Sequence, residues 1–253
     1  MTDGQKPLNI VILAAGLGTR MRSDRAKVLH RLDGRPLIDH VCQTAVLLSP
    51  QRIYFVVGHQ AEEVKQSVAN EFELAGFEFV RQEKQLGTGD AVNSARPFLA
   101  EQDSTVLVLS GDVPLIREST LRSLIEEHER DGAACTFLTV KLANPFGYGR
   151  IVRDSNGQFS EIVEQKDASE PEKLITEINS GIYCFDSRKL FDALEKVQNK
   201  NAQREYYLTD VPRILREAGE TVSIFLHDRP VEVEGVNDRK QLAAIERMIH
   251  DET

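Results

Sequence analysis

The stretch Leu8-Asn9-Ile10-Val11-Ile12-Leu13, followed by Ala14-Ala15-Gly16-Leu17-Gly18-Thr19-Arg20-Met21, decides the fold class of this chain. Its first six residues are mostly branched aliphatic, which is typical of a strand buried on both faces of a parallel sheet. The glycine-rich loop therefore follows the carboxyl end of a strand, where ligands bind in open α/β sheets. Glycines there let backbone N–H groups approach an anion, and Arg20 adds a fixed positive charge. We expect this loop to wrap phosphates.

Two common nucleotide-binding patterns do not fit this loop. The dinucleotide fingerprint requires a third glycine where this chain has Met21, so hydride chemistry with a nicotinamide cofactor is disfavoured. No Gly-Lys-Ser or Gly-Lys-Thr closes the loop, which excludes the P-loop pattern. A tight strand-to-helix turn without a ligand remains the simpler alternative.

Length and composition favour an ordinary globular enzyme. The chain has 253 residues, of which 41% are hydrophobic, enough for one large α/β domain or two small ones. The net charge of -9 argues against nucleic-acid binding, which needs basic surface to neutralise phosphates. We find no bilayer-spanning segment and no signal peptide, and therefore expect a cytoplasmic protein without a membrane partner. The histidines show no metal-ligand spacing, and three separated cysteines predict buried thiols: Cys42, Cys135 and Cys184.

Helical and strand patterns alternate through the first half of the chain. Such alternation predicts a parallel sheet with helices on both faces. The expected helices are 36–48, 61–69 and 89–99, and the expected strands after the first are 52–58, 77–81 and 105–110. We predict an α/β, Rossmann-like fold with a mostly parallel, mixed sheet.

The second half changes character. Strand patterns at 133–140, 159–165 and 178–185 have few helical patterns between them, which predicts an added mixed or antiparallel portion for substrate recognition. Three more helices and one strand complete the chain, at 187–197, 208–218, 239–250 and 221–227. Without a repeat or a low-complexity linker, we expect one compact unit with two lobes.

Two side chains near the predicted strand ends suggest phosphate and metal binding. Lys27 lies seven positions after Arg20, so two cations can face one polyphosphate. Asp112 follows the strand that ends at 110, and its carboxylate can hold Mg²⁺, which takes one or two protein oxygens and completes its shell with phosphates and water. The simpler alternatives are a solvated lysine and a turn aspartate that bonds its own backbone.

Further polar groups suggest recognition of a base and a sugar. The amide of Gln82, with Gly87 and Thr88, suits the edge of a pyrimidine. An ordinary helix start, with Thr88 as its cap, explains the same residues equally well. Gly147-Tyr148-Gly149-Arg150, Glu164 and Asn179-Ser180-Gly181 lie at strand ends and suit a sugar pocket, or simply form turns. Asn237 can cap the last helix or supply a second oxygen to the metal.

Taken together, these motifs occur in the order of one family. The chain resembles the uridylyltransferase half of the bacterial bifunctional N-acetylglucosamine-1-phosphate uridylyltransferase / glucosamine-1-phosphate acetyltransferase, from about Leu8 to the last helix. The motifs are L-A-A-G-L-G-T-R-M, K-V-L-H, Q-L-G-T-G, G-D-V-P-L, G-Y-G-R-I, I-V-E-Q-K-D-A, E-I-N-S-G-I, E-Y-Y-L-T-D and E-V-E-G-V-N. The resemblance implies transfer of UMP from UTP to N-acetylglucosamine 1-phosphate, giving UDP-N-acetylglucosamine, a cell-wall precursor, and pyrophosphate.

The resemblance also implies roles for single residues. Arg20 and Lys27 match the cations that act on the phosphates, and Asp112 and Asn237 match the two protein ligands of Mg²⁺. The positions that match substrate contacts are Leu13, Ala14, Ala15 and Gly16 for phosphate, Gln82, Gly87 and Thr88 for uracil, and Gly149, Glu164 and Asn179 for the sugar pocket. Asn237, besides its place at the metal, also counts among the substrate-binding positions. The reaction expected is direct in-line attack of the sugar phosphate on the α-phosphorus, because no Ser-His or Cys-His pairing calls for a covalent intermediate.

Three departures from the family pattern stand out. Ala26 replaces the usual proline before Lys27, so we expect that segment to be more mobile and saturation with UTP to suffer. Ser110 stands where many members have a larger side chain, which affects packing against the ribose. The family's hexapeptide-repeat domain is absent, so we expect no acetyl-coenzyme A activity and leave the oligomeric state open.

The expected organisation is a catalytic domain over 1–237, with a nucleotide-binding part of about 1–115 and a sugar-binding part of about 116–230, and a C-terminal helix over 238–253. Two other functions remain open. One is a nucleotidyltransferase for another sugar 1-phosphate or for dTTP, and the other is a non-catalytic sensor of nucleotide sugars. A sensor is expected to lose phosphate and metal ligands, whereas all four are present here.

Overall fold

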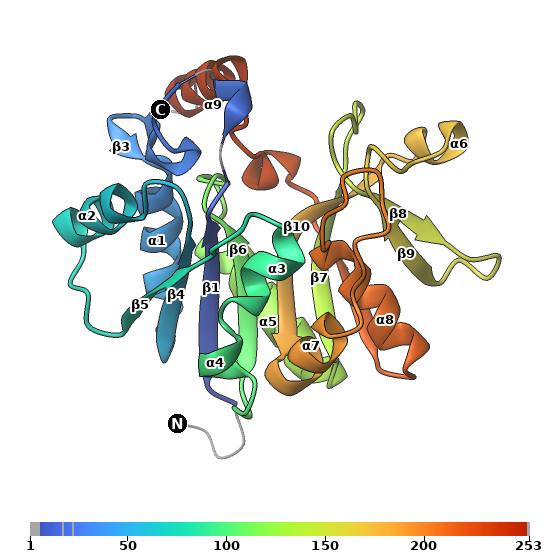
Figure 1. Ribbon diagram of the computed structural model, residues 1–253. Helices are drawn as coiled ribbons and strands as arrows, with labels where there is room; N and C mark the ends of the chain where they lie inside the picture. Colours follow the sequence, from blue (N-terminus) through green and yellow to red (C-terminus); the bar gives the residue numbers. More distant parts are fainter. Residues whose placement is uncertain (1–5, 17, 22, 252–253) are drawn as a thin grey trace.

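A mixed sheet forms the centre of the computed structural model (Figure 1), which describes residues 6–16, 18–21 and 23–251. Leu17, part of the predicted phosphate loop, lies outside the described residues. The strands of the sheet are β1 (Leu8–Ala14), β4 (Arg52–Val57), β5 (Phe77–Arg81), β6 (Thr105–Ser110), β7 (Cys135–Lys141), β8 (Arg150–Arg153), β9 (Phe159–Val163), β10 (Glu177–Asp186) and β11 (Val222–Leu226). A separate small sheet pairs β2 (Arg31–Leu32) with β3 (Arg35–Pro36).

The strand order explains the change in character between the two halves. The order is β11-β7-β10-β6-β1-β4-β5, with β8 and β9 branching from β10. Strands β6, β1, β4 and β5 run parallel, whereas β10 lies antiparallel to both β6 and β7. The predictions of a parallel first half and a mixed second half are both confirmed.

Helices cover both faces of the sheet (Figure 1). The α-helices are α1 (Leu37–Leu47), α2 (Ala61–Glu71), α3 (Thr88–Asn93), α4 (Arg96–Leu99), α5 (Glu118–Asp131), α6 (Glu170–Lys173), α7 (Ser187–Leu194), α8 (Val211–Glu217) and α9 (Arg239–Asp251). Short 3-10 helices are η1 (Thr19–Met21), η2 (Lys27–Leu29), η3 (Leu208–Asp210) and η4 (Pro230–Val233).

Two apolar clusters lie on opposite faces of the sheet. Alternate residues of β1 enter different clusters, because side chains alternate along a strand: Val11 packs toward α3, α4, α7 and α8, whereas Ile10 and Ile12 pack toward α1, α2 and α5. All three are fully buried. The prediction that β1 is covered on both faces is therefore confirmed.

The structure corrects two predicted helices and contains a long helix that was not predicted. The expected helix 89–99 is two helices, α3 and α4, because Pro97 lacks the N–H that a continuous helix requires. The expected helix 208–218 begins with the tighter turn η3. The 14-residue α5 was not predicted, because charged residues outnumber its apolar positions Leu121 and Leu124.

Helix α9 packs away from the main sheet. Its Ile245 belongs to a third cluster with Met21, Leu32, Leu37 and Val236, so the last helix is held against the segments around the glycine-rich loop. None of the helices within the described ranges has both the length and the apolar character that a bilayer crossing requires. The three cysteines are buried and unpaired, as predicted.

Candidate active site

The carboxyl ends of β1 and β6 lie side by side, and this places Asp112 beside the glycine-rich loop. The Gly111 N–H donates to the Leu13 carbonyl oxygen at 2.9 Å. A Cβ atom on Gly111 would lie 2.9 Å from the Ile38 Cδ1 atom and 3.0 Å from that same carbonyl oxygen. Only glycine fits this approach, so Gly111 sets where the chain turns toward Asp112.

Four predicted site residues converge at this edge. The Lys27 ammonium lies 2.5 Å from Asp112 Oδ2 and 3.2 Å from Asn237 Oδ1. Arg20 donates from Nη2 to the same Asn237 oxygen at 3.0 Å. Residues separated by more than 200 positions in the sequence therefore share one small polar centre, which we call the basic–acidic centre (Arg20, Lys27, Asp112 and Asn237).

The simpler alternatives for Lys27 and Asn237 are wrong. The Lys27 side chain is only 19% exposed and forms an ion pair with Asp112, so it is not a solvated surface lysine, and Asp112 has a charged partner outside its own turn. Asn237 does not cap α9, because Asp238 Oδ1 accepts from the backbone N–H groups of Lys240 and Gln241 at 2.8 and 2.9 Å. The amide of Asn237 thus remains directed toward the two cations.

The segment that carries Asn237 is fixed by a buried carboxylate, Glu232. Its side chain is 2% exposed and accepts from Thr120 Oγ1 at 2.5 Å, in the first turn of α5. The Nε atoms of Arg229 and Arg117 lie 3.2 and 3.6 Å from Glu232 Oε1. Farther along the segment, the Val236 N–H donates to the Asp112 carbonyl oxygen at 2.9 Å. These contacts hold the backbones of Asp112 and Asn237 together.

The predicted phosphate loop leaves a buried base and reaches the surface at Gly16. Ala14 and Ala15 are buried, whereas Gly16 is exposed and a Cβ atom there would meet no atom within 4 Å. The Ala15 carbonyl oxygen accepts from Gln85 Nε2 at 3.0 Å. Gln85, which sequence reasoning did not single out as a site residue, therefore ties the phosphate loop to the predicted base-reading turn.

The predicted base-reading turn is built around Gln82. This side chain is 5% exposed, and its Nε2 donates to the Gly87 carbonyl oxygen at 3.2 Å and to Asp90 Oδ2 at 2.7 Å. The structure corrects the view of Thr88 as a helix cap: Gly87 precedes α3, and the Thr88 hydroxyl accepts from the Leu208 N–H at 3.0 Å. The amide nitrogen of Gln82 thus holds the turn in place.

The turn is also clamped by residues from the second half of the chain. The Tyr206 N–H donates to the Leu86 carbonyl oxygen at 2.7 Å, and the Gly89 N–H donates to the Tyr206 carbonyl oxygen at 2.8 Å. Gly87 has φ +118, and a Cβ atom there would lie 2.5 Å from the Tyr206 carbonyl oxygen. Glycine at this position allows the clamp to close.

The structure brings the three residues predicted for the sugar pocket together. A Cβ atom on Gly149 would lie 3.6 Å from Glu164 Oε1 and 3.7 Å from Asn179 Cβ. The Asn179 side chain donates from Nδ2 to the Tyr183 hydroxyl at 2.7 Å, and Thr209 Oγ1 donates to Glu164 Oε1 at 3.1 Å. Both polar side chains are therefore oriented by neighbours.

Electrostatics distinguishes Glu164 from an ordinary surface carboxylate. Burial raises the pKa of Glu164, and the nearby carboxylates Asp167, Glu205 and Asp210 raise that pKa further, while the Thr209 hydrogen bond lowers it. Burial likewise raises the pKa of the Tyr183 hydroxyl well above its usual value. A neutral, polar ligand with hydroxyl or amide groups suits such surroundings better than an anion does.

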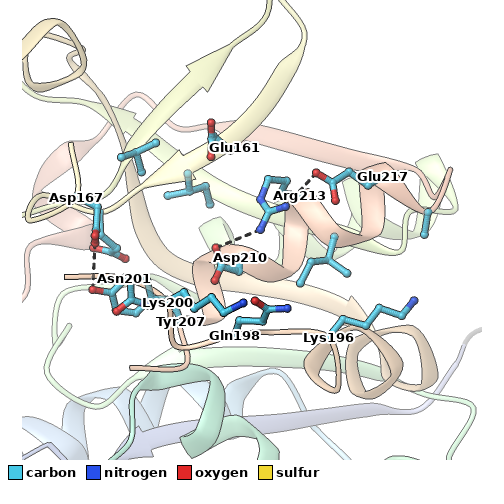
Figure 2. A pocket seen from close by; sticks show the side chains of 15 residues that line it. Glu161, Asp167, Lys196, Gln198, Lys200, Asn201, Tyr207, Asp210, Arg213 and Glu217 are labelled. Atoms are coloured by element: carbon cyan, nitrogen blue, oxygen red, sulfur yellow. Dashed lines mark hydrogen bonds and ion pairs between the residues drawn. The ribbon is translucent and has the colours of Figure 1, made fainter. Parts of the chain in front are cut away.

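A large cavity that Glu164 helps to line lies away from the basic–acidic centre. It has a volume of about 710 Å³ and is lined by β9, α8 and the residues around Tyr207. Figure 2 shows Arg213 pointing toward Asp210 and Glu217, with Nη atoms 3.7 and 3.0 Å from their carboxylates. The Tyr207 hydroxyl donates to Asp167 at 3.2 Å. Because these charged groups satisfy one another, we assign no ligand to this cavity.

Comparisons with known proteins agree with the fold. The nucleotidyl transferase family matches residues 9–229. The bifunctional protein GlmU of Syntrophomonas wolfei is 48% identical over 242 residues, which cover 96% of this chain and 53% of that protein. GlmU of Bacillus subtilis is 46% identical over 241 residues, covering 95% of this chain and 52% of its own. The chain thus spans about half the length of these curated relatives.

A solved structure supports the fold independently. A UDP-glucose pyrophosphorylase complexed with UDP-glucose superimposes with a TM-score of 0.78 over 98% of this chain and 100% of that chain, at 16% sequence identity. The likeness of the two structures confirms the mostly parallel α/β architecture. Because the family match extends from β1 to beyond β11, the chain belongs to the nucleotidyl transferase family.

Proposed function

We propose that this protein transfers UMP from UTP to N-acetylglucosamine 1-phosphate, giving UDP-N-acetylglucosamine and pyrophosphate. The observation that carries the proposal is the basic–acidic centre, where Arg20 and Lys27 meet Asp112 and Asn237 at the carboxyl edge of the sheet. The similarity to bifunctional GlmU proteins over nearly the whole chain supports the choice of substrates.

The two cations have distinct surroundings that suit a triphosphate. Arg20 is exposed, so its guanidinium is accessible to an incoming phosphate, whereas Lys27 is mostly buried beside a carboxylate. Charge-assisted contacts of this kind stabilise the negative charge that builds on a departing pyrophosphate. The backbone of residues 13–16 supplies N–H groups around the same phosphates.

Asp112 and Asn237 fit a magnesium ion. Their oxygens, Oδ2 and Oδ1, both approach the Lys27 ammonium, so the structure already directs two hard oxygen ligands at a positive charge. One carboxylate and one amide oxygen match the few protein ligands that Mg²⁺ uses beside phosphates. When bound, Mg²⁺ neutralises phosphate charge during transfer.

The proposed reaction is an in-line displacement. An oxygen of the sugar phosphate forms a bond to the α-phosphorus of UTP while the bond from that phosphorus to the bridging oxygen breaks, and pyrophosphate leaves with the electron pair. The attacking phosphate is already ionised at neutral pH, so alignment and charge neutralisation matter more than proton transfer.

We assign recognition of the base to the first part of the chain, about 1–115, and recognition of the sugar to about 116–230. The Gln82 nitrogen is engaged with Gly87 and Asp90, which leaves the amide oxygen to accept from the uracil ring, together with backbone groups of Gly87 and Thr88. Gly149, Glu164 and Asn179 then contact the sugar and its acetamido group.

The test measures pyrophosphate release with UTP, Mg²⁺ and a panel of sugar 1-phosphates. Release that depends on N-acetylglucosamine 1-phosphate supports the proposal. Faster turnover with glucose 1-phosphate, or with dTTP in place of UTP, identifies another sugar nucleotidyltransferase. Binding of the nucleotide sugar without any turnover would indicate a non-catalytic sensor and overturn the proposal.

A further inference from the structure

The position of Lys27 depends on the residue before it. Ala26 is 5% exposed, and its backbone has φ -53 and ψ 139. Its carbonyl oxygen accepts from the Leu29 N–H at 3.0 Å, which starts the short turn η2 that contains Lys27. A buried backbone N–H without a partner is destabilising, so the partner of the Ala26 N–H matters for this turn.

That partner is the side chain of Gln60. The Ala26 N–H donates to Gln60 Oε1, a contact between segments 34 positions apart. Gln60 follows β4, the parallel neighbour of β1, and it immediately precedes α2. A residue that follows β4 therefore supports the loop that follows β1, the neighbouring strand in the sheet.

The backbone of Gln60 is itself unusual. It has φ 59 and ψ 39, the left-handed conformation in which glycine is normally found. A glycine there would relieve the strain but would supply no amide to Ala26. The strained conformation aims the glutamine side chain at the Lys27 turn.

A second contact also confines Lys27. A Cβ atom on Gly18 would lie 2.7 Å from Lys27 Cβ, so the glycine-rich loop packs directly on this side chain. With the turn held by this contact and by the Gln60 hydrogen bond, the ammonium lies 2.5 Å from Asp112 and 3.2 Å from Asn237.

We propose that Gln60 is a positioning residue for Lys27: through the Ala26 N–H, it holds the turn that delivers the lysine ammonium to the basic–acidic centre. The inference rests on the proposed function for its kinetic consequence, because Lys27 is the group expected to meet the phosphates of UTP. It also implies that the segment around Lys27 is held firmly, although Ala26 lacks the restricted φ angle of the usual proline.

Two substitutions test the proposal as a pair. Gln60→Gly removes the amide and suits the left-handed backbone, so the start of α2 is retained. Ala26→Pro, added to Gln60→Gly, removes the N–H that has lost its partner, and a proline ring holds φ close to the -53 observed for Ala26.

We expect Gln60→Gly to raise the KM for UTP about tenfold, the size expected for one orphaned buried N–H, with a smaller change in the KM for the sugar phosphate. The double variant Gln60→Gly/Ala26→Pro should return to within about twofold of the wild type. As a matched control, Gln66→Ala removes an exposed glutamine within α2, the helix that Gln60 precedes, whose Nε2 donates to Asn70; this variant should leave the KM unchanged.

A direct readout separates this inference from the identity of the substrate. Amide hydrogen exchange of Ala26, followed by NMR, should be slow in the wild type and at least about tenfold faster in Gln60→Gly. Fast exchange in the wild type, or a double variant no better than Gln60→Gly, overturns the positioning role. If wild-type protein turns over no sugar phosphate while the exchange result holds, only the proposed function fails.

Discussion

Lys27 and Asp112 form an ion pair of 2.5 Å in which neither side chain is more than 19% exposed. The ammonium also contacts Asn237, so one cation lies between the two oxygens that we assign to magnesium. Removing either partner leaves the other charge in a poorly solvated place, which is destabilising for buried pairs. The pair therefore links the stability of the site to its chemistry.

Asp112→Ala tests this centre directly. We expect kcat to fall by roughly 100-fold or more, because charge stabilisation at the phosphates is lost, while far-UV circular dichroism remains that of the wild type. Asp228→Ala is the matched control. Asp228 lies shortly before the segment that carries Asn237, but its side chain is 94% exposed. Wild-type turnover in Asp112→Ala would contradict the metal assignment.

Gly87→Ala tests the clamp between the predicted base-reading turn and Tyr206. The new Cβ atom would lie 2.5 Å from the Tyr206 carbonyl oxygen at φ +118, so the clamp must open. We expect a loss of about 2 kcal/mol in the free energy of unfolding and a raised KM for UTP.

The control for this variant is Gly157→Ala, which has φ +77 but no atom within 4 Å of the new Cβ position. Both substitutions carry backbone strain, and only Gly87→Ala carries the clash. Urea denaturation and steady-state kinetics on the two variants measure the difference. Equal KM values for UTP would show that the clamp does not support nucleotide binding.

Asp39 makes stability depend on pH. It is 1% exposed in α1, and burial, followed by the charge of Glu71, raises its pKa from 3.8 to about 6. Between these values the folded protein binds more protons at Asp39 than the unfolded chain does, so the contribution of Asp39 to stability falls as pH rises from about 4 to about 6 and then stays low.

Asp39→Asn removes this penalty. We expect the variant to gain on the order of 2 to 3 kcal/mol over the wild type at pH 7 and much less near pH 4, as measured by urea denaturation across this range. Asp33→Asn, which removes an exposed carboxylate six positions earlier, is the control for the loss of one negative charge. A constant difference for Asp39→Asn would refute the raised pKa.

Glu232→Gln tests the support of the Asn237 segment. The substitution keeps an acceptor for Thr120 but leaves Arg117 and Arg229 without their carboxylate. We expect about 3 kcal/mol lower stability and a higher Mg²⁺ concentration for half-maximal activity.

Glu118→Gln is the comparison variant, because it alters a partly exposed pair with Arg122 in the same helix and should change stability by less than about 0.5 kcal/mol. Chemical denaturation and Mg²⁺ titration of turnover distinguish the two. An unchanged Mg²⁺ requirement in Glu232→Gln would show that Glu232 does not support the metal site.

Sequence patterns predicted the helices and strands best in segments where local chemistry and burial agree. Strands β5 and β6 begin and end at the predicted residues, because their apolar runs are short and bounded by polar or turn-forming residues. Helix α5 was missed because only a narrow stripe that includes Leu121 and Leu124 faces the core, and its many charges obscured the period. The hydrogen bond from the Ala26 N–H to Gln60 is likewise a contact that no local pattern encodes.

The amino-acid sequence by itself determined the alternating α/β architecture, and it supplied the prediction of a phosphate loop and of the residue types that phosphate, metal and sugar require, because periodicity and side-chain chemistry are local properties. Only the tertiary structure decided that Arg20 and Lys27 meet Asp112 and Asn237, that Asp238 rather than Asn237 caps the last helix, and that Gln60 supports the lysine turn. Those relationships depend on which strand ends become neighbours in the sheet, and strand order follows from packing of the whole chain rather than from any single segment.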